Sequence, residues 1–327
     1  MHDGGSARQM RAWRFCALSV PAAMALTRGG WPWVLGGSVL AAAIGALQGA
    51  LSRRCGGDLA AAMPAAFGKH GARGAAMLAG LWLLFAAAGA STACQAAFEE
   101  DLGALSPAVP LLLALITCRK GAGAAARACT VMAMATAGLY AIVIVSSLRH
   151  ITPVWCAPWG AARDGALALL LGLTPGCAVY FAEENAAGWR GAAIEALFAP
   201  LLAFLTAACL SPELTSATAQ PLYTLTKSLS VLSVMQRFEA LLSAAQMMGV
   251  AALECMLVCA AMRMTRMIAP HADEENAAGA FCAAAFGLSF AVPRVPMWIW
   301  AVGSGIFWGV FPILTLVIVD IKKIQKF

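Results

Sequence analysis

Long apolar runs separated by short polar segments dominate the chain. A membrane-crossing helix needs about 20 mostly apolar residues, because each residue adds 1.5 Å along the helix axis. Runs that approach this length occupy residues 12–27, 31–52, 74–97, 106–118, 124–148, 165–182, 191–210, 239–262, 277–293 and 297–319. This pattern predicts an all-α polytopic membrane protein with about ten transmembrane helices.

The chain forms a single predicted transmembrane domain over residues 1–327. We expect helices 1–5 within residues 12–148 and helices 6–10 within residues 165–319. A flexible N-terminal segment, 1–10, and a basic tail, 320–327, flank them.

The placement of Lys and Arg predicts the orientation of the chain. Cytoplasmic loops of membrane proteins collect these residues. Of the 22 Lys and Arg residues, six fall in segments expected outside, which leaves sixteen inside. The six outer residues are Arg28, Arg149, Arg163, Lys227, Arg237 and Arg294. Both termini are therefore expected in the cytoplasm, and the number of helices is expected to be even.

The composition excludes several classes of protein. The chain is 61% hydrophobic and only 12% charged, whereas soluble domains carry about 25% charged residues. A disordered chain, a nucleic-acid-binding domain and an ordinary cytosolic enzyme are excluded. The eleven cysteines contain no CxxC pair and mostly lie in apolar runs, where cysteine acts as a small hydrophobic residue. Common enzyme motifs are absent, and all four histidines lie outside the predicted spans. We predict no enzyme activity, no cofactor and no metal site.

Two connections are expected to form helices outside the membrane core. Residues 58–70 suggest a short inner surface helix that is broken near Pro64. In residues 222–235, apolar side chains recur every three or four positions, which is typical of an amphipathic helix. Such a helix either lies on the membrane surface or covers a binding site.

Proline interrupts the first and the sixth predicted helices. Pro21 lies inside the first, and Pro175 with Gly176 lies inside the sixth. Proline removes a backbone donor and disturbs the preceding turn. Breaks at matching positions of two halves indicate a transporter site built from an inverted repeat, although two ordinary proline kinks would give the same spacing. On the first interpretation, the substrate-binding candidates are Ser19, Pro21, Thr174, Pro175, Gly176 and Tyr180.

Glu254 lies deep inside the eighth predicted helix. A charge at that depth costs several kcal/mol unless it is paired or hydrated. We therefore expect Glu254 to be protonated at neutral pH. It is a candidate proton or ion site, or a hydrogen-bonding residue between helices.

Four stretches together resemble the spore-germination permeases, which are the B subunits of nutrient germinant receptors. They share short proline, glycine and charged patterns with that family, in the same order along the chain. The stretches are GGWPWVLGGSVLAAAIGAL at 29–47, DLAAAMPAAFGKHGARGAAMLAGLWLLF at 58–85, LSPAVPLLLALITCRKGAGAAARACTVMA at 105–133 and PLYTLTKSLSVLSVMQRFEALL at 221–242. That family belongs to the amino acid/polyamine/organocation transporters.

The resemblance implies a leucine-transporter-like fold of two inverted five-helix repeats. It implies that a small nutrient, typically an amino acid, binds between the broken first and sixth helices. It also implies assembly with larger A and lipoprotein C subunits in the spore inner membrane, with membrane lipid around the chain and no nucleic acid partner.

Two alternatives stay open. One is a free-standing proton-coupled amino acid permease of the same fold. The other is a non-binding membrane scaffold subunit, because the sixth helix reads TPGCAVY where the family carries an acidic residue.

Overall fold

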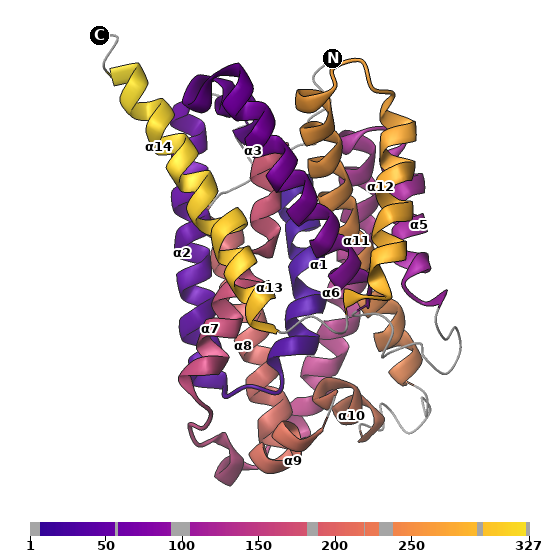
Figure 1. Ribbon diagram of the computed structural model, residues 1–327. Helices are drawn as coiled ribbons and strands as arrows, with labels where there is room; N and C mark the ends of the chain where they lie inside the picture. Colours follow the sequence, from indigo (N-terminus) through magenta and orange to yellow (C-terminus); the bar gives the residue numbers. More distant parts are fainter. Residues whose placement is uncertain are drawn as a thin grey trace.

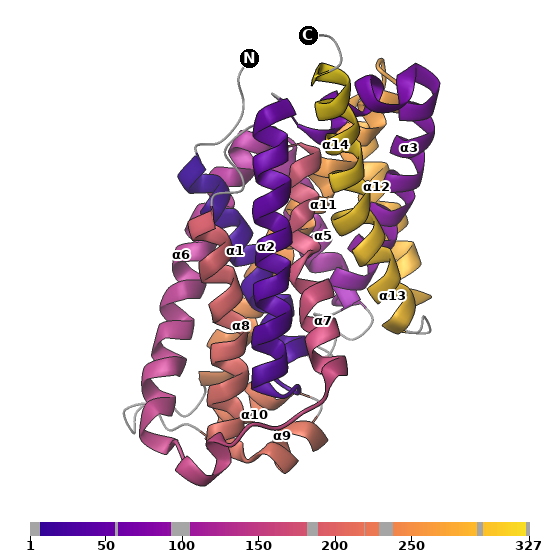
Figure 2. The same ribbon diagram turned by 90° about the vertical axis from the view of Figure 1, so that its left-hand side faces the viewer.

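The computed structural model describes residues 7–55, 58–92, 105–181, 189–218, 220–228, 238–292 and 297–324. These residues are almost entirely helical and contain no strand. The helices pack side by side into an elongated bundle, and the first described helix begins at the same end of it at which the last one finishes (Figures 1 and 2). The prediction of an all-α protein is confirmed.

The first part of the bundle consists of five long or medium-length helices. They are α1 (Ala7–Leu26), α2 (Trp31–Cys55), α3 (Leu59–Thr92), α5 (Ala108–Cys118) and α6 (Ala122–Ser147). The short 3-10 helices η2 (Leu148–His150) and η3 (Pro153–Cys156) follow α6.

The second part contains more irregular segments. It comprises α7 (Ala162–Gly172), the 3-10 helix η4 (Thr174–Tyr180), α8 (Trp189–Leu210), α9 (Pro212–Ala217), α10 (Pro221–Ser228), α11 (Phe238–Ile268), α12 (Glu274–Ser289), α13 (Met297–Ser304), the π-helix η6 (Gly305–Val310) and α14 (Phe311–Ile324). The short helices α9 and α10 lie at the end of the bundle opposite the termini (Figure 1). Of the expected helix over 222–235, the described part ends with α10 at Ser228, and residues 229–237 lie outside the described residues.

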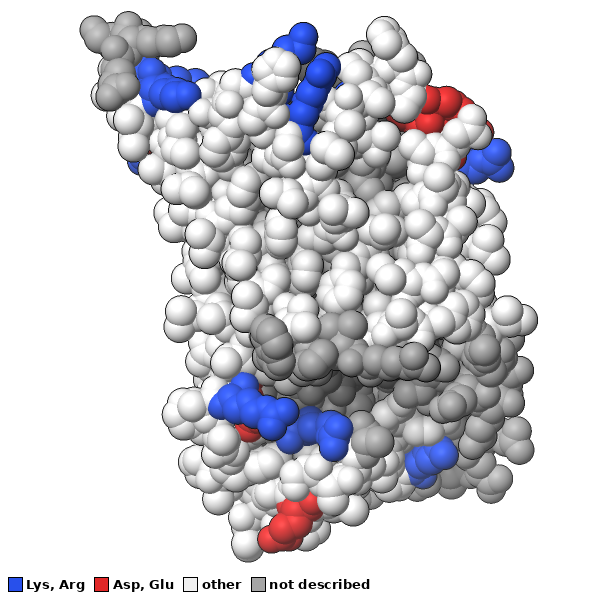
Figure 3. Space-filling model, viewed as in Figure 1, with Lys and Arg blue, Asp and Glu red and all other residues white. Residues whose placement is uncertain are grey.

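Five helical segments are long and apolar enough to cross a membrane. They are Trp31–Cys55, Leu59–Thr92, Ala122–His150, Leu241–Ile268 and Val302–Ile324. Large apolar side chains such as Leu81, Val131 and Val145 are exposed on their outer faces. On the face shown in Figure 3, the charged side chains lie toward the two ends of the bundle, and the described surface between them is uncharged. These features fit an integral membrane protein.

Helices α3 and α11 pack against each other in the interior, and α11 also contacts α1, α5 and α6. Helix α2 packs against α7 and α8. The contact between α2 and α7 is very close, because a Cβ atom at Gly37 would overlap the carbonyl oxygen of Gly165. Small residues allow such approaches between membrane helices.

Four expected breaks and helix ends differ from the structure. Helix α1 begins at Ala7 rather than at residue 12, and it continues through Pro21 without a break. Proline is tolerated in membrane helices where neighbouring groups satisfy the freed backbone carbonyls. The surface helix and the third span are joined in α3 by a kink at Gly68, and Pro64 stays helical. Gly68 has φ 72° and ψ 174°, which glycine adopts readily. Helix α14 reaches Ile324, so it takes in most of the expected tail at 320–327.

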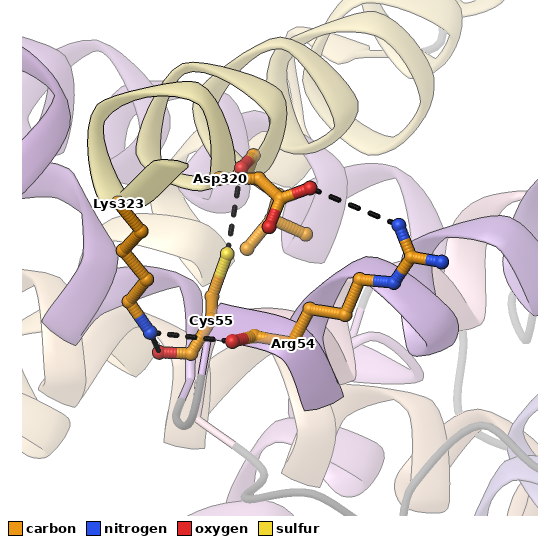
Figure 4. A network of polar contacts seen from close by, with 5 residues as sticks. Arg54, Cys55, Asp320 and Lys323 are labelled. Atoms are coloured by element: carbon orange, nitrogen blue, oxygen red, sulfur yellow. Dashed lines mark hydrogen bonds and ion pairs between the residues drawn. The ribbon is translucent and has the colours of Figure 1, made fainter. Parts of the chain in front are cut away.

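Two lysines attach the end of α14 to its neighbours. Lys323 Nζ donates to the carbonyl oxygens of Arg54 at 3.2 Å and Cys55 at 2.8 Å, at the C-terminal end of α2 (Figure 4). Lys322 Nζ donates to Ala65 and Ala66, whose carbonyls precede the kink in α3. Cations are favoured at helix C-termini, where carbonyl groups lack partners within the helix. The two lysines therefore hold α2, α3 and α14 together at this end of the bundle.

Candidate functional site

The sixth predicted helix changes its geometry in the interior of the bundle. Helix α7 ends at Gly172, and the chain continues as the 3-10 helix η4 from Thr174 to Tyr180. The backbone N–H of Gly176 donates to the carbonyl of Leu173 at 2.8 Å. η4 contacts α1, α2, α3, α11 and η6. The expected departure from α-helix at Pro175 and Gly176 is confirmed, and it lies where many helices meet.

A second irregular segment lies next to η4. The π-helix η6 contacts η4, and its carbonyl groups accept hydrogen bonds from side chains of other helices. Tyr180 Oη donates to the carbonyl of Phe307 at 2.7 Å. Gln48 Nε2, on α2, donates to the carbonyl of Trp308 at 2.5 Å. Single π-helical turns are frequent at functional sites, and this one is tied to η4 and α2 through its backbone.

Two side chains that carry opposite charges when ionised are buried at the same depth beside η4. Trp13 Nε1 donates to the carbonyl of Ala252 at 2.8 Å, which aligns α1 with α11. The neighbouring Arg14 is 8% exposed, and Glu254 is fully buried. Helices α1 and α11 both contact η4. Arg14 and Glu254 therefore approach η4 from two different helices.

Glu254 lies in an environment that lacks compensating donors. In the described part of the chain, neither of its carboxyl oxygens has a hydrogen-bond partner. Its electrostatic neighbours are the thiols of Cys177 on η4, Cys282 on α12 and the adjacent Cys255. An unpaired charge in such a place is costly. A bound proton or a bound cation would remove that cost.

The structure brings some of the sequence-predicted residues together. Gly176 and Tyr180 lie in η4, and α11, which carries Glu254, contacts η4. Tyr180 is almost fully buried, and its hydroxyl already donates a hydrogen bond to the carbonyl of Phe307. Thr174 begins the same segment. The side chains of Ser19, Pro21 and Pro175 lie outside what the structure describes, so it does not place them at the site.

Sequence reasoning missed two residues of this region. Arg14 was expected among the cytoplasmic cations, but α1 begins at Ala7, so Arg14 lies about two turns inside the helix. Gln48 is an amide within a predicted span and is 1% exposed. Its position in an apolar run was a usable signal, because buried polar groups normally need partners. The π-helix had no comparable signal in the sequence.

The described residues contain no group of three or more His, Cys, Asp and Glu side chains placed to hold a metal ion. Comparison of the chain with family models and with curated proteins found no match.

Proposed function

We propose that the protein binds a small zwitterionic nutrient, an α-amino acid, beside η4, as the permease-like subunit of a spore nutrient germinant receptor. One arrangement carries the binding proposal: Arg14 and Glu254 are both buried, and the 2.8 Å bond from Trp13 Nε1 to the Ala252 carbonyl places them on adjoining turns of α1 and α11. Side chains that can carry opposite charges, buried at one depth, complement the carboxylate and ammonium groups of an amino acid. The irregular backbone of η4 belongs where it borders protein or a wet cavity rather than lipid.

The packing of the helices supports two inverted five-helix repeats. In this proposal, each helix of the first half has a counterpart in the second half. The counterpart of α1 is α7 with η4, that of α2 is α8, that of α3 is α11, that of α5 is α12, and that of α6 is α13 with α14. A two-fold relation between the halves requires every contact to have a counterpart. The contact of α2 with α7 is matched by that of α8 with α1. The contacts of α3 with α12 and α14 are matched by those of α11 with α5 and α6.

This correspondence gives ten passes through the membrane, five in each half. The same two-fold axis would exchange α2 with α8, and it would exchange α3 with α11. The two helices of each pair are in contact. Helix α1 differs from its counterpart, because it is continuous where α7 gives way to η4. Only one of the two halves would therefore supply a broken helix.

The receptor assignment rests on the sequence resemblance. It implies A and C subunits as partners and the spore inner membrane as the location, with both termini in the cytoplasm. The start of α1 and the end of α14 lie at one end of the bundle, which agrees with an even number of passes (Figure 2). The helices α9 and α10, at the opposite end, would then cover the external approach to η4.

Glu254 favours a second candidate, a free-standing proton-coupled amino acid permease. A buried carboxyl group that has no hydrogen-bond partner among the described residues can exchange a proton during a transport cycle. Copurification of A and C subunits with the chain would support the receptor. Proton uptake that accompanies amino acid uptake into liposomes containing the chain alone would support the permease.

Equilibrium binding of radiolabelled amino acids to the purified protein tests the binding proposal. We expect a bound amino acid, and we expect Arg14→Gln to weaken its binding by about tenfold or more. Arg11→Gln is the matched control, since Arg11 is exposed on the same helix, and it should leave binding nearly unchanged. No binding by the wild-type protein to any proteinogenic amino acid would overturn the proposal and favour a non-binding scaffold.

A further inference from the structure

Positive charge is concentrated on one side of the bundle end at which α14 finishes. The stretches where α2 and α14 end and where α3 bends are residues 50–55, 316–324 and 65–77. Together they contain six Lys and Arg residues and one acidic residue, Asp320. The hydrogen bonds of the two lysines at the end of α14 hold these three stretches side by side. This side of the bundle end therefore has an excess of positive charge.

The other side of the same end is nearly balanced. Residues 117–127 and 263–276, around the ends of α5 and α11, contain five basic and three acidic residues. Carboxylates of neighbouring helices pair with three of these basic residues. The pairs are Arg119 with Glu275, Arg263 with Asp58, and Arg266 with Glu274. The acidic side chains visible at this end lie over α12 (Figure 3). An anionic partner is therefore favoured at α2, α3 and α14.

Two cationic side chains come together where α2 meets α14 (Figure 4). The Arg54 side chain is 70% exposed, and its Nη1 atom lies 3.8 Å from Asp320 Oδ2. That distance is too long for a hydrogen bond, so the guanidinium keeps donors for another acceptor. Lys323 Nζ has three donors and uses two of them on the carbonyls of Arg54 and Cys55. With one carboxylate beside two cations, the site remains positive.

Exposed apolar faces lead away from this site along both helices. Leu40 and Leu47 precede Arg54 in α2 at steps of seven residues, so the three share one face of the helix. Leu314 and Ile321 are also seven residues apart, in α14. All four apolar side chains are about half exposed. The site thus joins a cationic head to an apolar surface, and a soluble anion would use only the first of these.

We propose that Arg54 and Lys323 bind the phosphate of an anionic phospholipid, whose acyl chains lie along the exposed apolar faces of α2 and α14. The guanidinium of arginine matches the geometry of phosphate oxygens. Basic sites between membrane helices bind anionic lipid head groups in this way. The inference goes beyond the proposed function and does not depend on it, because no residue near η4 takes part.

Native mass spectrometry tests the site. The protein is equilibrated in detergent micelles with equal amounts of phosphatidylglycerol and phosphatidylcholine, and the lipids that remain bound are counted. We expect the wild-type protein to retain phosphatidylglycerol in preference. Arg54→Gln should lower that preference about fivefold, the effect of one cation beside a lipid surface. Arg54→Lys should keep most of it, because the charge remains.

Lys120→Gln is the matched control, since Lys120 is exposed at the same end of the bundle, next to α5. It removes the same charge from the other side and should leave the preference within about twofold of the wild-type value. Asp320→Asn should act in the opposite direction and strengthen the binding of phosphatidylglycerol, because it removes the carboxylate beside Arg54. A role of the Arg54–Asp320 contact in packing alone would make both substitutions weaken the binding.

Three results would overturn the inference. One is equal retention of the two lipids by the wild-type protein. The second is an equal loss of preference in Arg54→Gln and Lys120→Gln, which would reflect net charge alone. The third is displacement of the lipid by soluble glycerol phosphate, which would assign the site to a free phosphate group. Where Arg54→Gln fails to fold, the increase expected for Asp320→Asn decides.

Discussion

The ring of Trp300 in α13 packs directly on Gly89 of α3, at the position that a side chain of residue 89 would occupy. The reverse contact is also present, because Trp82 of α3 lies against Gly303 of α13. The two indole rings are 6.1 Å apart, and Phe85 stacks on Trp300 with ring centroids 4.2 Å apart. Each tryptophan thus packs onto a glycine of the facing helix, and the two contacts hold α3 and α13 together next to η6.

Gly89→Ala should destabilise the protein, because the new methyl group would collide with the Trp300 ring. Overfilling a packed interior typically costs about 1–3 kcal/mol. Gly80→Ala is the control on the same helix, since its Cβ atom would meet no described atom within 4 Å. Thermal unfolding of the two variants in detergent checks this. A midpoint lowered equally by both variants would contradict the packing described.

Glu254→Gln should abolish the pH dependence of ligand binding while preserving the fold. The amide keeps the shape of the side chain but cannot gain or lose a proton. Stability should change little, because the carboxyl oxygens have no hydrogen bonds among the described residues to lose. The surrounding titratable groups, Cys177, Cys282 and Cys255, remain in the variant. The affinity for the amino acid, measured from pH 5 to pH 8, should change with pH in the wild-type protein. It should stay constant in Glu254→Gln.

The control for this prediction is Glu213→Gln, at an exposed position in α9. It should retain the wild-type pH profile. If Glu254→Gln leaves the pH profile of ligand binding unchanged, the role of Glu254 is limited to helix packing.

Much of the fold could be predicted from the sequence, because membrane helices need long apolar runs. The five described helices that are long and apolar enough to cross a membrane overlap five of the ten predicted spans. The ends of the helices were harder to predict, because charged residues such as Arg8 and Arg11 do not stop a helix that projects beyond the apolar layer. The kink in α3 depends on the backbone of Gly68, and sequence reasoning placed it at the more conspicuous Pro64.

The candidate site was predictable only in part. Proline and glycine marked η4 correctly, because they disturb helices through local sterics. At Pro21 the same signal was misleading, because the helix continues there. Gln48 and η6 depend on contacts between segments about 260 residues apart, and a single sequence gives no direct record of such contacts.

Cys118 and Cys259 should form a disulfide when the protein is treated with diamide. Their Sγ atoms lie 3.7 Å apart, across the contact between α5 and α11. A disulfide requires about 2.05 Å, so a small movement of the two side chains suffices. The two thiols lose two protons and two electrons, and diamide is reduced to the corresponding hydrazine.

Mass spectrometry of the digested protein should identify the peptide pair containing Cys118 and Cys259. The pair should be absent from Cys118→Ser. A predominant disulfide between either cysteine and Cys16 or Cys209 would contradict the packing of α5 on α11.

Hydrogen–deuterium exchange with and without a bound amino acid tests the central claim, that the ligand is held beside η4. The account predicts slower exchange in peptides covering residues 176–181 when the ligand is bound, because a ligand there restrains η4 and excludes water. Peptides covering α12 should exchange at the same rate in both states. Unchanged exchange in residues 176–181 at a saturating amino acid concentration, with slowing elsewhere in the bundle, would contradict the account.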